Sequence, residues 1–165
     1  MLLFQTIIAM STKNHPGIYL PPPLLYVFFF LISFLLQRSW PLRQSLLKTT
    51  TAQIAGFILI AFYFLIAIPA IKQFAISKNT LVTIKPANSL QTTGIYSFTR
   101  NPMYLSLVLL YSGLAVFFGN WWTFILLPLL LLTIQVYVIK KEEDYLMQTF
   151  GQDYLHYKRN VRRWI

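Results

Sequence analysis

The sequence predicts an all-α integral membrane protein with about four transmembrane helices and a cytosolic amphipathic helix at its C-terminal end. Hydrophobic residues make up 56% of the 165 residues, and charged residues only 11%. Soluble domains carry about 25% charged residues, so this composition indicates a protein surrounded by lipid. The length fits one membrane domain over residues 1–165.

Four long apolar runs are the predicted spans. They are Ile18–Leu36, Ala52–Ile71, Pro102–Phe118 and Trp121–Ile139. A span needs about 20 residues, so the third run is slightly short, and three prolines weaken the start of the first. Only Gly119 and Asn120 separate the last two runs, which predicts a tight helical hairpin. Residues 1–10 are too short to cross and do not resemble a signal peptide, which predicts an interfacial or packing segment.

The distribution of basic residues predicts the orientation in the membrane. Four spans place both termini and the loop between the second and third spans on one side. That side carries eleven Lys and Arg, and the other side carries only Arg38, Arg43 and Lys48. The positive-inside rule therefore makes the richer side cytoplasmic. Because the basic residues flank apolar runs, we expect the net charge of +10 to meet anionic membrane lipids and not nucleic acid.

The stretch GIYSFTRNPMY, residues 94–104, is polar where the third span begins. Asn101 is a favourable helix cap, and Pro102 suits the first helical position. On a purely structural interpretation, Arg100 extends to the lipid phosphates. On a functional one, Arg100 and the partial positive charge of the helix start form a site for a carboxylate or phosphate. The sequence leaves both interpretations open.

The stretch KKEEDYLMQTFG, residues 140–151, follows the fourth span. It holds Glu142 and Glu143, although paired carboxylates are costly beside anionic headgroups. Either these acids pair with Lys140, Lys141 or Arg100, or at least one holds an amine, a ribose hydroxyl or a sulfonium. An anion site and a cation site on one face would match a zwitterionic ligand.

The last residues predict a helix that lies along the membrane surface. Its apolar positions recur at helical spacing with basic residues between them, and Gly151 is expected to break it. The apolar positions are Tyr154, Tyr157, Val161 and Trp164, and the basic residues are Lys158, Arg159, Arg162 and Arg163.

Together, NSLQTTGIYSFTRNPMY, the helical hairpin and EEDYLMQTFGQDYLHYKRNVRRW resemble the isoprenylcysteine carboxyl methyltransferase and phospholipid methyltransferase superfamily. The likeness covers about Lys85–Trp164 and includes the order and spacing of both motifs. It implies an integral membrane enzyme that uses S-adenosylmethionine. Residues 85–165 would then be the cofactor-binding catalytic half, and residues 1–84 the N-terminal spans. The implied acceptor is lipophilic: a prenylcysteine-like carboxylate, a phospholipid or another hydrophobic small molecule.

The resemblance also implies which positions bind the cofactor. They are Asn88, Ser89, Leu90, Gln91, Tyr96, Arg100, Asn101, Pro102, Met103, Tyr104, Glu142 and Glu143. Arg100 and Glu142 are the candidate catalytic residues, which would hold the cofactor's carboxylate and its cationic or ribose part. Tyr96 and Tyr104 would stack on the adenine or line the reaction channel.

Two positions depart from the family pattern. The usual histidine is Asn101, which cannot ionise but still donates and accepts hydrogen bonds. An arginine that contacts substrate in the eukaryotic prenylcysteine enzymes falls at Val138, which argues against that substrate unless Lys140 or Lys141 replaces it.

Other functions have less support. His15 and His156 are isolated and the chain has no cysteine, so no metal site is expected. A membrane reductase of the same superfamily would need more spans. A non-catalytic membrane protein, whose basic tail binds anionic lipid or a partner, remains an alternative. The sequence does not indicate an oligomeric state.

Overall fold

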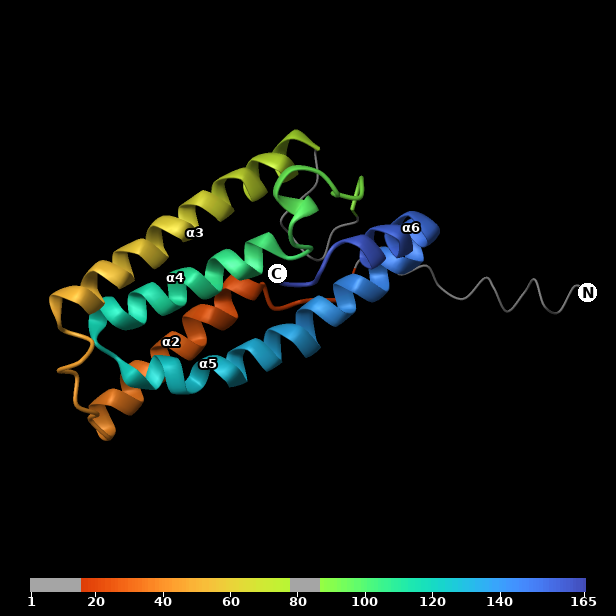
Figure 1. Ribbon diagram of the computed structural model, residues 1–165. Coiled ribbons are helices and arrows are strands. Elements are labelled where there is room, and N and C mark those ends of the chain that lie inside the picture. The colour runs from red at the N-terminus through yellow and green to blue at the C-terminus, as the bar shows by residue number, and fades with distance from the viewer. Residues whose placement is uncertain (1–15, 78–86) are drawn as a thin grey trace, which may run out of the picture.

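The computed structural model describes residues 16–77 and 87–165, which form a bundle of apolar helices (Figure 1). The helices are α2 (Pro22–Ser39), α3 (Thr50–Ile76), α4 (Pro102–Phe118), α5 (Trp121–Thr133) and α6 (Lys140–Asn160). A 3-10 turn, η1 (Gly94–Ser97), precedes α4, and a π-helical segment, η2 (Ile134–Ile139), joins α5 to α6. The predicted interfacial segment, residues 1–10, lies outside the described residues.

Three described helices are long and apolar enough to cross a membrane: α2, α3, and the continuous helix that starts at Trp121. α4 is equally apolar but has only 17 residues. Large apolar side chains such as Phe57, Phe64 and Leu65 are exposed on α3. An exposed apolar surface of this extent is stable only in lipid. The chain is therefore an all-α membrane protein, as the sequence predicts.

The bounds of the first two spans differ from the prediction for local reasons. α2 begins at Pro22, because a proline at the first helical positions loses no hydrogen bond there. α3 starts after Thr49, whose side-chain oxygen accepts a hydrogen bond from the Ala52 amide at 3.2 Å. It then continues five residues past the predicted end to Ile76.

α3 and α4 pack closely because two glycines face each other. A Cβ atom at Gly113 would lie 2.7 Å from Cγ1 of Ile60 and 3.0 Å from the carbonyl oxygen of Gly56. Small residues let helix backbones approach in lipid, where dispersion contacts and not burial from water drive helix association. This contact fixes α4, and with it the turn that precedes α4.

The predicted hairpin between α4 and α5 is confirmed. Gly119 has a left-handed backbone (φ 69°), and the Asn120 side chain caps α5 by accepting from the Trp122 amide at 3.0 Å. Asn120 also donates to the Ser33 hydroxyl at 3.1 Å, and the Ser33 and Thr123 hydroxyls are 2.8 Å apart. All three side chains are buried. We call Ser33, Asn120 and Thr123 the hairpin cluster.

α6 turns back towards the bundle at Gly151, whose φ of 51° and ψ of −117° interrupt the helix as predicted (Figure 1). The predicted helical continuation to Trp164 is wrong. The helix ends at Asn160, Val161 is extended, and the last residues run beside the start of α4. Trp164 packs against the apolar core of the bundle.

Candidate functional site

The turn before α4 is attached to α3. Gly94, at φ 60°, lets the chain enter η1. Gln73 donates from Nε2 to the Thr93 hydroxyl at 2.7 Å, and the Phe74 and Tyr96 rings stack with their centres 5.7 Å apart. These contacts hold the segment that follows, which carries the predicted site residues.

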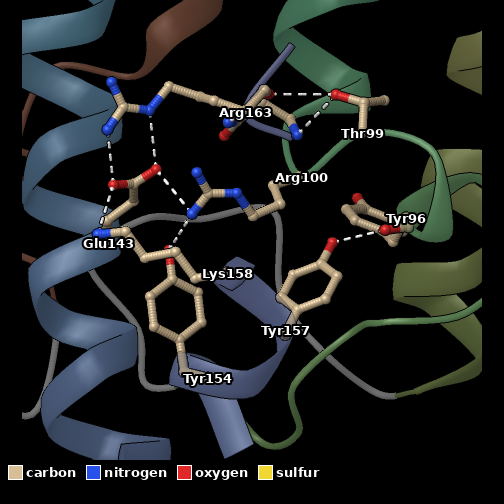
Figure 2. A network of polar contacts seen from close by, with 9 residues as sticks. Tyr96, Thr99, Arg100, Glu143, Tyr154, Tyr157, Lys158 and Arg163 are labelled. Carbon is tan, nitrogen blue, oxygen red and sulfur yellow. Dashed lines mark hydrogen bonds and ion pairs between the residues drawn. The ribbon is translucent and has the colours of Figure 1, made fainter. Parts of the chain in front are cut away.

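Five residues from this turn, α6 and the C-terminal segment form one polar cluster around a single carboxylate (Figure 2). Arg163 donates to both oxygens of Glu143, from Nε at 2.9 Å and from Nη2 at 2.8 Å. Arg100 Nη1 lies 3.2 Å from Oε1, and Lys158 Nζ lies 3.5 Å from Oε2. Arg100 also donates to the Tyr154 hydroxyl at 3.2 Å. We call these five residues the Glu143 cluster.

The Glu143 cluster carries a net positive charge, because three cations surround one carboxylate. The side chains of Arg100 and Glu143 are each only 9% exposed, so water screens them weakly. Burial opposes ionisation of Glu143, but the Arg163 hydrogen bonds and the charges of Arg100, Arg163 and Lys158 outweigh it and lower its pKa. Glu143 therefore stays ionised, and the excess positive charge is available to an anion.

Glu142 has a different environment from its neighbour. The Tyr104 hydroxyl donates to its Oε1 at 2.7 Å, and among the described residues no cation pairs with it. Its accessible surface is intermediate, yet protein surrounds most of the carboxyl group. This burial raises the pKa of Glu142 to about 7, against the Tyr104 hydrogen bond and with a smaller contribution from the Glu143 charge. Two adjacent acids thus differ in charge state near neutral pH.

Two buried polar atoms beside these acids have no hydrogen-bond partner within the described structure: the Tyr96 hydroxyl and Nε of Arg100. Tyr96 is held by its backbone, whose carbonyl accepts from the Tyr157 hydroxyl at 2.6 Å. Burial, the Tyr157 hydroxyl and the charge of Glu142 raise the pKa of Tyr96, so this hydroxyl lies within electrostatic range of Glu142. An unpaired buried donor is costly, and such atoms commonly mark ligand sites.

The expected role of Asn101 as a side-chain cap is wrong, although Asn101 does precede α4 and Pro102 is its first residue. Asn101 donates from Nδ2 to the carbonyl oxygen of Arg163 at 3.0 Å. The first amides of α4, from Met103 and Tyr104, consequently have no side-chain cap. The helix start keeps donors and a partial positive charge close to Arg100.

The residue that precedes the predicted loop of residues 88–91 contacts α6. The Ala87 amide donates to the Tyr145 hydroxyl at 3.0 Å, and within the loop Gln91 donates to the Ser89 hydroxyl at 2.8 Å. Tyr145 lies three residues after Glu142 on α6. A hollow of about 520 Å³ adjoins this contact. It is lined by Pro16, Gly17, Tyr19, Lys141, Asp144, Tyr145 and Gln148.

Three expectations about single side chains are corrected. Arg100 does not extend to lipid phosphates, because it is buried against Glu143. Neither Lys140 nor Lys141 pairs with the acids: both are exposed, and the Lys141 ammonium lies 4.3 Å from the centre of the Tyr137 ring.

Comparison with known proteins shows the family of this chain. Residues 51–153 match the sequence profile of phospholipid methyltransferases. This chain belongs to that family. It is also 38% identical over 63 residues to an uncharacterized protein of Haemophilus influenzae, a match that covers 38% of this chain and all of the relative. No solved structure matches the chain.

The part that matches phospholipid methyltransferases contains Arg100, Glu142 and Glu143 but ends before Tyr154 and Arg163. Sequence reasoning missed five residues of the site: Thr99, Tyr154, Tyr157, Lys158 and Arg163. It assigned all of these except Thr99 to a surface helix. The available signal was the charge balance, because two adjacent acids require nearby cations and the last eight residues are the richest source of them.

Proposed function

We propose that this protein is an S-adenosylmethionine-dependent methyltransferase that acts on a lipophilic acceptor. The observation that carries the proposal is the contrast at one end of the bundle. The Glu143 cluster is positive, and the adjacent Glu142 is a carboxylate that no cation neutralises in the described structure. S-adenosylmethionine has both a carboxylate and cationic groups, so it is complementary to this arrangement.

The donor set at this end fits the cofactor. Nε of Arg100 and the first amides of α4 would donate to its carboxylate, and each now lacks a side-chain acceptor. Glu142 would accept from its ammonium or ribose hydroxyls, or lie close to its sulfonium. The unpaired Tyr96 hydroxyl offers one further donor beside Glu142.

Methyl transfer from this cofactor requires little acid–base catalysis by the chain. When bound, the cofactor supplies a methyl group on a sulfonium that is already an activated leaving group. The residues of the chain then have to bind, orient and exclude water. Tyr104 is held at two points for this purpose: its hydroxyl donates to Glu142, and its carbonyl accepts from the Tyr26 hydroxyl at 3.1 Å.

The charge distribution supports a cytoplasmic site. Arg38 lies in the last turn of α2, and Arg43 and Lys48 lie in the α2–α3 connection, which contacts the hairpin end. The other basic residues in the described ranges belong to the ends of α3 and α4 near η1, to α6, and to the C-terminal segment. Under the positive-inside rule this end faces the cytoplasm. The cofactor would then arrive from the cytoplasm and the acceptor from the bilayer.

Two observations narrow the alternatives. Val138 is fully buried in η2, so no arginine contacts an acceptor there, which favours a phospholipid or another hydrophobic small molecule over a prenylcysteine. Lys158 and Arg163 contact Glu143, so two of the four tail cations already pair within the protein. This pairing weakens the alternative in which the tail serves only to bind lipid.

The test is cofactor binding by the purified full chain in nanodiscs, measured by calorimetry with S-adenosylmethionine and, separately, with a reduced nicotinamide cofactor. We expect binding of the first and not of the second. Lipid extracts incubated with methyl-labelled cofactor and analysed by mass spectrometry should then show which molecule gains the label. An absence of S-adenosylmethionine binding in both detergent and nanodiscs would refute the proposal.

A further inference from the structure

We propose that the C-terminal segment Val161–Ile165 is a clasp that positions Arg100, and that Arg163 is the positioning residue on which the clasp depends. This inference rests on the proposed function, since it assigns the clasp to the cofactor's carboxylate site. The segment lies beyond the residues that match the family profile.

The backbone of the clasp is bonded to three consecutive residues before α4. The Arg100 amide donates to the Arg162 carbonyl at 3.0 Å. The Thr99 hydroxyl and the Asn101 amide group both donate to the Arg163 carbonyl, at 3.2 Å and 3.0 Å. Arg100 thus lies between two residues that are bonded to the same carbonyl oxygen (Figure 2 shows Thr99, Arg100 and Arg163).

The side chain of Arg163 fastens the other side of the clasp. Its guanidinium donates to both oxygens of Glu143, and this two-point contact fixes distance and orientation together. Through its carbonyl and its guanidinium, Arg163 therefore joins the turn before α4 to α6. Glu143 is in turn the ion-pair partner of Arg100, so the clasp restrains the backbone of Arg100 through the Arg162 carbonyl and its side chain through Arg163 and Glu143.

The clasp also limits how many hydrogen bonds Glu143 accepts from Arg100. With both oxygens of Glu143 occupied by Arg163, Arg100 makes a single contact with Glu143, through Nη1 at 3.2 Å, and its Nε has no partner among the described residues. Without Arg163, Glu143 would accept two bonds from Arg100 itself and draw its donors away from a ligand. Arg163 consequently keeps Arg100 both in place and available.

The matched variants are Arg163→Ala, Arg163→Lys and Arg159→Ala. Arg159 is exposed in the last turn of α6 and forms no ion pair in the described structure, so its removal subtracts the same charge without touching the clasp. We expect Arg163→Ala to raise KM for S-adenosylmethionine by about tenfold, the order of one charge-assisted contact, while kcat changes by less than about threefold. Arg163→Lys should fall between, since lysine keeps the charge but not the two-point contact.

A second readout does not depend on activity. Hydrogen exchange in nanodiscs should show the Arg100 amide protected in the full chain and in Arg159→Ala, and exchanging faster in Arg163→Ala. Equal exchange in all three proteins would overturn the clasp, whatever the cofactor results. Failure of the full chain to bind S-adenosylmethionine, with the exchange difference present, would refute the proposed function and with it the assignment of the clasp to the cofactor site.

The pH profile separates positioning from a loss of general stability. The groups that face Glu143 are Arg100, Lys158, Arg163, Tyr154 and its neighbour Glu142. Removing the Arg163 charge should raise the pKa of Glu143, so the rise in KM that follows Glu142 protonation, at still lower pH, should begin at higher pH in Arg163→Ala than in Arg159→Ala. A variant that is merely less stable would show the same profile as Arg159→Ala, and that result would contradict the inference.

Discussion

The two polar clusters at opposite ends of the bundle differ in how completely their groups are paired. In the hairpin cluster, neutral hydroxyl and amide groups bond to one another and to the Trp122 amide and the Phe30 carbonyl. In and around the Glu143 cluster, positive charge is in excess and two buried polar atoms have no partner in the described structure.

This difference separates a structural use of polarity from a binding use. A fully paired neutral network joins helices and specifies their packing. A network with surplus charge and unpaired donors stabilises the fold less by itself. Binding of a complementary ligand pairs these groups and increases the stability of the folded state. Substitutions at the hairpin end should therefore change stability, and substitutions at the charged end should change affinity.

The largest expected effect is that of Arg100→Ala on cofactor binding. It removes a buried cation and its unpaired donor, and we expect the affinity for S-adenosylmethionine to fall by about 100-fold, the range of a buried charged hydrogen bond. Calorimetry in nanodiscs measures this loss. Arg38→Ala, which removes an exposed arginine from the other end, should leave the affinity unchanged. Equal affinity in both variants would show that the charged end contributes no more to cofactor binding than the hairpin end does.

The converse test is Asn120→Ala in the hairpin cluster. It removes the cap of α5 and the bond to Ser33, and we expect a loss of about 2 kcal/mol in the free energy of unfolding. A lower melting temperature in detergent, with unchanged S-adenosylmethionine affinity, is the expected outcome. A large loss of affinity at unchanged stability would show that the hairpin end takes part in binding.

Cofactor affinity should depend on pH through Glu142, whose burial raises its pKa to about 7. The carboxylate is protonated below this value, so affinity should rise by about tenfold between pH 6 and pH 8. Stability should change in the opposite direction. Because the folded-state pKa of Glu142 lies above the ordinary glutamate value of 4.5, the stabilisation is complete below about pH 4.5 and is lost as pH rises through about 7. Glu142→Gln should flatten both profiles, which titration calorimetry and melting curves across this range would detect.

The smallest expected effect is that of Asn101→His, which restores the usual family residue. Imidazole Nδ1 can donate to the Arg163 carbonyl in place of the asparagine amide, so we expect less than about a threefold change in affinity. Binding and exchange of the Arg100 amide both measure it. A loss comparable to that of Arg100→Ala would mean that the amide group of Asn101 contacts the ligand directly.

The helices could be predicted because apolar length and simple turn residues determine them. The four apolar helices and the turn at Gly119 and Asn120 follow from rules that act over a few residues. The path of the chain after Asn160 could not be predicted in this way. Its apolar spacing suits a helix, but the carbonyls of Arg162 and Arg163 accept bonds from residues about 60 positions earlier. Tertiary partners outweigh local periodicity there.

The site was predicted only in part, because the pairing of its residues also depends on tertiary contacts. Motif order indicated that Arg100 and the paired acids share one end of the bundle, and the structure brings them together. Which acid pairs with Arg100 was not predicted. That choice depends on the rotation of α6 about its axis, and the π-helical segment η2 changes this rotation relative to a continuous α-helix.

The π-helical segment η2 therefore has a consequence for how the sequence tolerates length changes. Each α-helical residue turns the chain by about 100° and advances it by about 1.5 Å, and a π segment accommodates additional residues in its turns. Deleting one residue between Ile134 and Ile139 would let this segment close into an α-helix and keep Glu142 and Glu143 near their present direction, whereas deleting one residue from the α-helical part of α5 would turn both acids by about 100° around the axis. A protein shortened within α5 would still insert into a bilayer, yet its two acids would face away from Tyr104 and Arg100.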